Sequence, residues 1–232
     1  MTGTLLVAEA AVTVAWREPF SALLAQRSQS ELANGLGQLE RSVSRELREL
    51  DGGAPAAPTG AQASTPRRRR ARPRLSVAER AALVAESMNA SVESGSPLGR
   101  LRIGSIDLDF IVAQGAGTES LRKGPGHYSD TPLPGSGGTV AIGGHRTTFL
   151  APFRRLDAVE RGDRISLALP YGRFSYIVEG SKIVSPADLK VLSHVRHERL
   201  VLTACHPLYS DAQRIVVFAR LDRLAPPTRL PF

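Results

Sequence analysis

The chain has 232 residues, enough for one full domain with additional segments. Apolar residues make up 42% of it, near the usual value for a globular protein, which excludes wholesale disorder. Lysine and arginine total 30 against 22 acidic residues, but nearly all of the basic residues are arginine, so the charge alone does not indicate a nucleic-acid partner. The single cysteine, Cys205, excludes an internal disulfide framework and a cysteine-rich metal site.

The N-terminal segment 1–18 contains an apolar run from Thr4 to Trp16. The run is shorter than the stretch of about 20 apolar residues that crosses a bilayer, and it contains Glu9. Trp16 and the charged residues after it are typical of a membrane interface. Two interpretations stay open on these residues: a short helix lying on a surface, or the outer part of a membrane anchor.

Three segments with different compositions follow. Residues 19–50 repeat leucine and valine at spacings of three and four, which predicts an amphipathic helix. Residues 51–75 form a linker rich in Pro, Ala and Arg, and its basic run is interpreted as solvated, with contact to nucleic acid, anionic lipid or an acidic polymer as the alternative. Residues 76–97 are expected to be a short helix and a connection, with Ser76 and Glu79 placed to form a capping box.

Residues 98–225 change to short, β-branched segments separated by turns, ahead of a C-terminal tail at 226–232. This pattern is typical of an antiparallel barrel or sandwich, so the fold class is mainly β with short helices. The expected strands lie within 101–112 and at 139–142, 163–169, 173–179, 200–203 and 214–219.

Three polar residues stand at the ends of expected strands: His145, Cys205 and Arg214. A neighbouring cation raises the thiolate fraction of a cysteine, an arginine binds an oxyanion, and an imidazole protonates a leaving amine. The trio therefore suits acyl transfer on a peptide bond. On spacing alone, a buried structural cysteine is the favoured interpretation, because cysteine is among the most often buried residues.

Local sequence motifs change that balance. Gly-Pro-Gly-His-Tyr ends at Tyr128, Gly-Gly-His-Arg at Arg146, Thr-Ala-Cys-His-Pro at Pro207, and Ala-Gln-Arg at Arg214. This succession resembles the sortases, the bacterial cysteine transpeptidases that join proteins to the cell wall or into pili. These motifs are most similar to those of the class E housekeeping sortases of actinobacteria.

The resemblance implies an eight-stranded β-barrel with His145, Cys205 and Arg214 as its catalytic residues. It implies cleavage of a Leu-(Pro/Ala)-x-Thr-Gly sorting signal between Thr and Gly, followed by transfer to an amine of a cell-wall precursor or a pilin. It implies no cofactor, no metal and no nucleic-acid partner. It also favours the membrane-anchor interpretation of residues 1–18, with the catalytic domain outside the cell.

The resemblance also marks residues that flank the site. The usual threonine before the cysteine is Ala204 here, so a hydroxyl expected near the substrate is missing, while Thr203 and His206 stand on either side. His127 could flank the substrate groove, although a turn histidine bonded to the backbone is favoured. His194 and His197 fall in a segment interpreted as helical, which in this family borders the substrate groove; without a third ligand they do not indicate a metal site.

One hypothesis from another class remains beside the enzyme. The chain could be a basic adaptor that binds an acidic wall polymer or nucleic acid through the Arg67–Arg70 run, with a catalytically idle barrel. The two hypotheses differ at Cys205, because the adaptor needs no reactive thiol. A cysteine hydrolase would differ from the transpeptidase only in the nucleophile that resolves the thioester.

Overall fold

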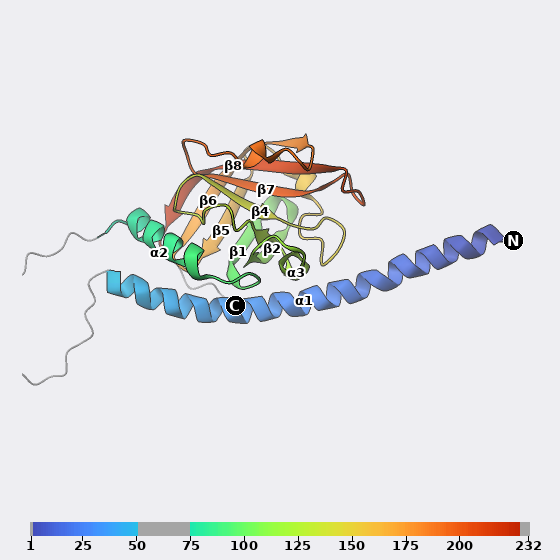
Figure 1. Cartoon of the computed structure of the whole chain (residues 1–232), viewed down its shortest axis with the longest axis horizontal. Coiled ribbons are helices and arrows are strands. Elements are labelled where there is room, and N and C mark those ends of the chain that lie inside the picture. Colours follow the sequence, from blue (N-terminus) through green and yellow to red (C-terminus); the bar gives the residue numbers. More distant parts are fainter. Residues whose placement is uncertain (1, 51–74, 228–232) are drawn as a thin grey trace, which may run out of the picture.

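The computed structural model describes residues 2–50 and 75–227, with side chains from Ser21 onward. The basic run at 67–70, almost all of the expected linker and most of the expected C-terminal tail lie outside the described residues. The remaining chain forms a β-barrel with a long helix along one side (Figure 1).

Eight strands close into a barrel in the order β1-β2-β3-β4-β7-β8-β6-β5, which confirms the expected fold class. Most of the strands coincide with the short β-branched segments of the sequence, and β6 and β8 run several residues further than the patterns indicated. The strands are β1 Pro97–Ile103, β2 Leu108–Gln114, β3 Gly126–His127, β4 Thr139–Gly143, β5 Arg164–Leu169, β6 Gly172–Val184, β7 Arg199–His206 and β8 Gln213–Ala225.

The barrel is not wholly antiparallel, and the expectation taken from strand patterns was wrong on this point. β2 pairs with β3, and β4 pairs with β7, in parallel. β6 and β7 both pair antiparallel with β8, so they run in the same direction, and the connection between them leaves β7 parallel to β4. Parallel neighbours end at the same edge of a sheet, and this brings the residues after β4 beside the end of β7.

Side chains alternate between the two faces of each strand, and this alternation decides which residues face the core. Along β7, Leu200, Leu202 and Ala204 belong to the main core, whereas Val201 belongs to a separate cluster with Ala141 and Val216. Successive side chains of a strand point to opposite faces, so this alternation separates the inside of the barrel from its outer surface. Cys205 therefore lies on the outer surface, on the same face as Val201.

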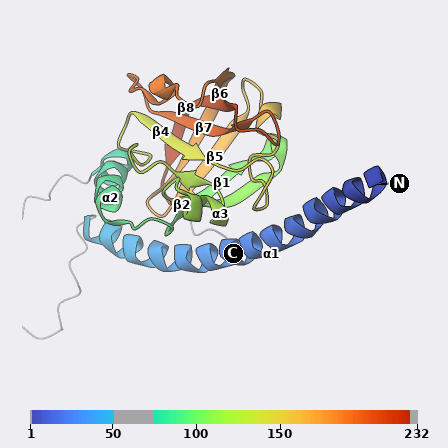
Figure 2. The same ribbon diagram turned by 45° about the vertical axis from the view of Figure 1, so that its right-hand side comes forward.

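The predicted helix at 19–50 is part of a longer helix, α1, which runs unbroken over Thr2–Leu50. Its buried side chains are Ala25, Leu32, Leu36 and Val43, at spacings that place them on the side turned to the barrel. Figures 1 and 2 show α1 passing along the barrel, with its N-terminal part extending beyond it. Across 2–50 and 75–227, none of the helices has the length and apolar character needed to span a membrane.

A glutamine fastens α1 to the sheet. The Gln29 amide nitrogen donates to the carbonyl oxygen of Ile111 at 3.1 Å, and its oxygen accepts from the Ile111 N–H at 2.8 Å. The same nitrogen also donates to the carbonyl oxygen of Lys123 at 2.7 Å. β3 pairs with β2 only at Ala113 and Gln114, so Gln29 satisfies a stretch of the β2 edge that none of the described strands covers.

Two shorter helices complete the described chain. α2 spans Val77–Ser91, and Ser76 and Glu79 form the expected capping box at its start. α3 spans Thr118–Lys123 and lies between α1 and the barrel (Figures 1 and 2). Its position links the N-terminal helix to the barrel end that carries His145.

Candidate active site

The register of the parallel pair β4–β7 brings His145 and Cys205 together. Gly143 is the partner of Thr203, and each candidate residue lies two positions further along its own chain. The Gly144 N–H donates to the Thr203 carbonyl oxygen at 3.1 Å, so the pairing continues past the last strand residue. The imidazole and the thiol therefore belong to neighbouring chain segments at one barrel edge.

Arg214 joins them from the other side of β7. It is the direct cross-strand partner of Cys205 in the antiparallel pair β7–β8. Side chains in such a pair share one face, with Cβ atoms about 5 Å apart. The guanidinium donates to the carbonyl oxygens of Asp211 at 2.8 Å and Gln213 at 3.0 Å, which hold it over the start of β8.

His145 is half-buried beneath an aromatic ring. The ring centroids of His145 and Phe149 are 5.3 Å apart, and the guanidinium carbon of Arg122 lies 5.9 Å from the Phe149 centroid. Burial lowers the pKa of His145 below its ordinary value, because the imidazolium loses hydration. The site thus favours the neutral imidazole in the free protein.

The loop after His145 is bent by an unusual backbone. Phe149, Leu150 and Ala151 have φ angles of 51°, 64° and 42°, a left-handed conformation that costs L-residues about 1–2 kcal/mol each. The Ala151 N–H donates to the Thr148 carbonyl oxygen at 2.8 Å, which closes the turn. Such strain concentrates at functional sites, and here the turn lies in the loop that places Phe149 against His145.

An apolar cluster with a buried floor lies beside Cys205 on the outer face of the sheet. Ala141, Val201 and Val216 form its floor. The side chains packed around this floor are Tyr128, Val184, Val191, Leu192 and Phe218. We call this set the outer cluster; it provides an apolar wall next to the thiol.

Tyr128 is a site residue that sequence reasoning missed. Burial raises the pKa of its phenol, the positive charge of Arg214 lowers it, and the charge of Cys205 raises it, which places the ring near both residues. Its signal is the tyrosine of the Gly-Pro-Gly-His-Tyr motif, next to His127. Alternation along β3 turns His127 inward, and Tyr128 contacts the outer cluster instead.

The predicted flanking residues separate into two groups. Thr203 and His206 lie next to the site at the end of β7, where the Thr203 carbonyl accepts from Gly144 and His206 contacts Arg146. Ala204 is 4% exposed and packs in the main core, so its side chain lies inside the barrel rather than on the face of Cys205. A hydroxyl at this position would also point into the barrel.

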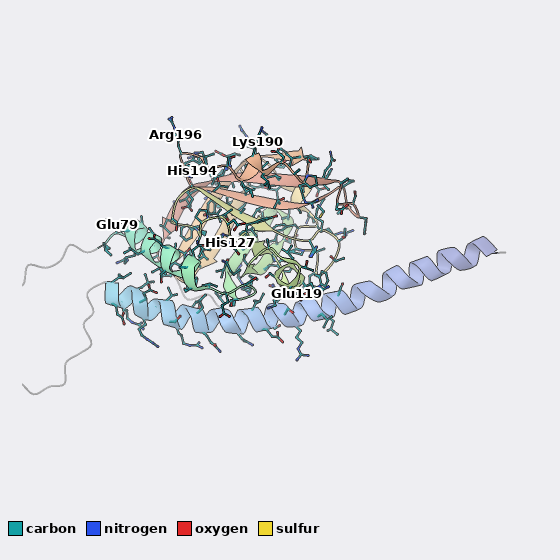
Figure 3. All side chains as sticks on the ribbon, viewed as in Figure 1. Glu79, Glu119, His127, Lys190, His194 and Arg196 are labelled. Atoms are coloured by element: carbon teal, nitrogen blue, oxygen red, sulfur yellow. The ribbon has the colours of Figure 1, made fainter. Side chains whose placement is uncertain are left out.

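His127, labelled in Figure 3, is buried among core residues of the barrel. Its Nδ1 lies 2.8 Å from the Gln114 side-chain oxygen and its Nε2 lies 3.2 Å from the Pro132 carbonyl oxygen. Burial lowers its pKa to about 4. These contacts fit the bonded turn histidine that the sequence favoured.

The segment between β6 and β7 is less helical than expected. Only Leu189–Leu192 form a short 3₁₀ helix, and both His194 and His197 lie after it with exposed side chains. His194 is labelled in Figure 3. Within the described residues, no three His, Cys, Asp or Glu side chains gather to hold a metal ion. The connection contributes Val191 and Leu192 to the outer cluster. Arg199 holds the connection in place by donating to the carbonyl oxygens of Val191 and Ser193, each at 3.0 Å.

Comparisons with known proteins agree with this architecture. The family model described as the sortase domain matches residues 101–222. Sortase D of Bacillus subtilis is 37% identical over 117 residues, which cover 50% of this chain and 57% of that protein. The chain thus spans little more than half the length of this curated relative.

Solved structures show the same relationship. Sortase E from Streptomyces avermitilis is 32% identical, with a TM-score of 0.53, covering 58% of this chain and 93% of that one. Sortase E1 from Streptomyces coelicolor, solved with a tripeptide in its active site, is 25% identical with a TM-score of 0.54, covering 57% and 91%. With the family model matching more than half of its residues, the chain belongs to the sortase family, whose members are cysteine transpeptidases.

Proposed function

We propose that this chain is a cysteine transpeptidase whose catalytic residues are His145, Cys205 and Arg214. One observation carries the proposal: the β4–β7 and β7–β8 registers bring these three residues to one edge of the barrel. Membership of the sortase family supports the same assignment.

The first half-reaction cleaves a peptide bond. The Cys205 thiolate attacks the threonine carbonyl carbon of the sorting signal, and the Arg214 guanidinium donates to the resulting oxyanion. The C–N bond then breaks, and the His145 imidazolium gives its proton to the departing glycine nitrogen. The products are a free glycine amine and a thioester on Cys205.

The second half-reaction transfers the acyl group. An acceptor amine attacks the thioester carbon, and neutral His145 takes the proton that this nitrogen loses. The carbon–sulfur bond breaks, which returns the Cys205 thiolate and the His145 imidazolium. No cofactor is needed, because the atoms and electrons balance between the two peptides.

We assign the substrate as a Leu-(Pro/Ala)-x-Thr-Gly signal on a secreted protein, and the acceptor as an amine of a cell-wall precursor or a pilin. The outer cluster supports an apolar segment before the threonine, because it places apolar side chains on the face that carries Cys205. Proline and alanine, the two residues assigned to the second position of the signal, are both apolar like the side chains of the outer cluster. Residues 1–18 would attach the protein to the membrane with the barrel outside the cell.

The experiment uses the full chain and two peptide series that differ only in Pro or Ala at the second position. Mass spectrometry should detect a thioacyl adduct on Cys205 and, with added amines, a new amide product. The matched control is Cys205→Ala, which should fold normally and form neither species. Cleavage retained in Cys205→Ala, or no adduct with any peptide of either series, would sink the transpeptidase assignment.

Attachment is tested separately. The full chain should sediment with membranes of an expressing bacterium and resist alkaline extraction, and protease added to intact protoplasts should digest the barrel. Release by alkali, or protection of the barrel inside the protoplast, would contradict the proposed location.

A further inference from the structure

Arg146, the residue after His145, is a buried guanidinium that the reaction scheme does not use. Its side chain is 1% exposed. Burying a charge is costly unless the group is paired and hydrogen-bonded, so the contacts that hold it are informative. They reach two separate parts of the site.

One set of contacts holds the loop that returns after His145. Nε and Nη2 of Arg146 donate to the Arg154 carbonyl oxygen at 3.4 Å and 3.1 Å. Nη2 also pairs with Oδ1 of Asp157 at 2.8 Å, and half of the Asp157 side chain is exposed to solvent. The Phe153 N–H donates to the His145 carbonyl oxygen at 2.9 Å, so this loop is fastened on both sides of Arg146.

The other set holds the end of β7. Nη1 of Arg146 donates to the Cys205 carbonyl oxygen at 3.5 Å and lies 3.2 Å from Nδ1 of His206. Because a guanidinium can only donate, Nδ1 of His206 accepts in this contact. The side chain that follows His145 thus touches the backbone of Cys205.

These contacts use the whole guanidinium. Its five N–H groups match the five contacts to Arg154 (twice), Asp157, Cys205 and His206. A lysine ammonium has the same charge but only three donors on a flexible stem. The fork geometry, rather than the charge, is therefore what bridges the two segments.

We propose that Arg146 is a positioning residue that fixes the His145 loop against the Cys205 end of β7, and so sets the distance between imidazole and thiol. The inference rests on the proposed function for its catalytic meaning. A displacement of about 1 Å between reacting groups costs on the order of 100-fold in rate, so such a clamp acts mainly on kcat.

The test compares Arg146→Lys with Arg155→Lys in the full chain. Arg155 lies in the same loop, but its guanidinium is exposed and pairs with Asp107 at 3.3 Å. In Arg146→Lys, kcat for sorting-peptide cleavage should fall about 10- to 100-fold while KM changes less than about threefold. Arg155→Lys should match the unsubstituted protein. A kcat within twofold in folded Arg146→Lys, with only its melting temperature reduced, would make Arg146 structural and overturn the inference.

A second measurement needs no substrate. Hydrogen exchange followed by mass spectrometry should show faster exchange at residues 144–146 and 204–206 in Arg146→Lys, with β5 and β6 unchanged. Unchanged exchange at these segments would also overturn the clamp. If the unsubstituted protein cleaves no peptide, the proposed function fails, whereas the exchange experiment still decides whether the clamp exists.

Asp157→Ala covers the case in which Arg146→Lys does not fold. It removes one contact from the solvent side of the guanidinium, where water can replace the carboxylate. The expected result is faster exchange at the same segments and a kcat reduced about threefold. Unchanged exchange and unchanged kcat in this variant count against the proposal.

Discussion

Cys205 and Arg214 stand directly opposite each other in the antiparallel pair β7–β8. The short cross-strand spacing puts the guanidinium within reach of any carbonyl attacked by the thiol. Arg214 itself is held only by backbone carbonyls of its own loop, at Asp211 and Gln213, among the hydrogen bonds of the described chain. Its substitution should therefore affect catalysis far more than folding.

Arg214→Lys is expected to lower kcat/KM for sorting-peptide cleavage about 100-fold or more, although the charge is kept. Loss of one oxyanion donor costs about that much, and an ammonium does not reproduce the planar fork. Steady-state cleavage rates measure the effect. The control is Arg220→Lys in the same strand, where the guanidinium is exposed and pairs with Glu179 at 3.5 Å. Near-normal activity in Arg214→Lys would reduce Arg214 to a general positive charge.

Phe149→Ala should raise the pKa of His145 toward the ordinary histidine value of about 6.5. Burial lowers this pKa in the intact site, and the ring of Phe149 lies against the imidazole. With a lowered pKa, little imidazolium remains at neutral pH, so the titration midpoint of the His145 ring should lie below 6.5 and move up in the variant. An NMR titration of the His145 ring checks the midpoint directly.

Tyr209→Ala supplies the control for that titration. Tyr209 is 76% exposed and its ring is stacked by Arg154, so its loss should leave the His145 midpoint unchanged. A midpoint in Phe149→Ala equal to that of the unsubstituted protein would show that other groups cause the burial.

His127 should make folding stability depend on pH. Its pKa is lowered to about 4 in the folded protein, whereas an unfolded histidine titrates near 6.5. Between these values the unfolded chain binds a proton that the folded protein does not, so stability falls as pH decreases from about 6.5 to about 4. The loss is on the order of 3 kcal/mol for this group.

His127→Gln should flatten that dependence, because an amide does not titrate and can still bond to Gln114 and Pro132. Urea unfolding at intervals between pH 4 and pH 7 gives the two curves. Equal slopes for the variant and the unsubstituted protein would mean that His127 is not the titrating group.

The barrel and the three candidate residues could be predicted from sequence because their signals are local. Short β-branched runs mark the strands, and His145, Cys205 and Arg214 each belong to a recognisable motif at a strand end. The sequence did not indicate which way two side chains face: Ala204 faces inward, and Tyr128 contacts the outer cluster. Parity depends on register with neighbouring strands, which a single sequence does not reveal.

Tertiary contacts account for the other differences. The role of Arg146 depends on Arg154, Asp157 and His206, which meet only after the loop has folded back. Gly35 lies inside α1, where a glycine lowers helix stability, but a Cβ there would lie 3.1 Å from the Pro97 ring. The glycine therefore permits α1 to approach β1 closely, and this benefit offsets its lower helix propensity.

The docking of α1 should depend on a single amide. Gln29 offers a donor and an acceptor to the Ile111 backbone, as a neighbouring strand would, and also donates to Lys123. In Gln29→Leu these partly buried backbone groups lose their partners, at about 1–3 kcal/mol for each unsatisfied group. We expect the Ile111 amide to exchange faster with solvent and protease to cut α1 sooner.

Gln26→Leu is the matched control, because Gln26 is exposed about one helical turn away. Among the hydrogen bonds of the described residues, its side-chain amide has none, and only its carbonyl oxygen accepts from a side chain, the Ser30 hydroxyl at 3.1 Å. Hydrogen exchange and limited proteolysis should not distinguish this variant from the unsubstituted chain. If Gln29→Leu also leaves the Ile111 amide protected, the apolar contacts of Leu32 and Leu36 with Ile111 and Ala113 suffice to dock the helix. Faster exchange at Ile111 in Gln29→Leu alone would instead show that hydrogen bonding to the uncovered β2 edge holds α1 on the barrel.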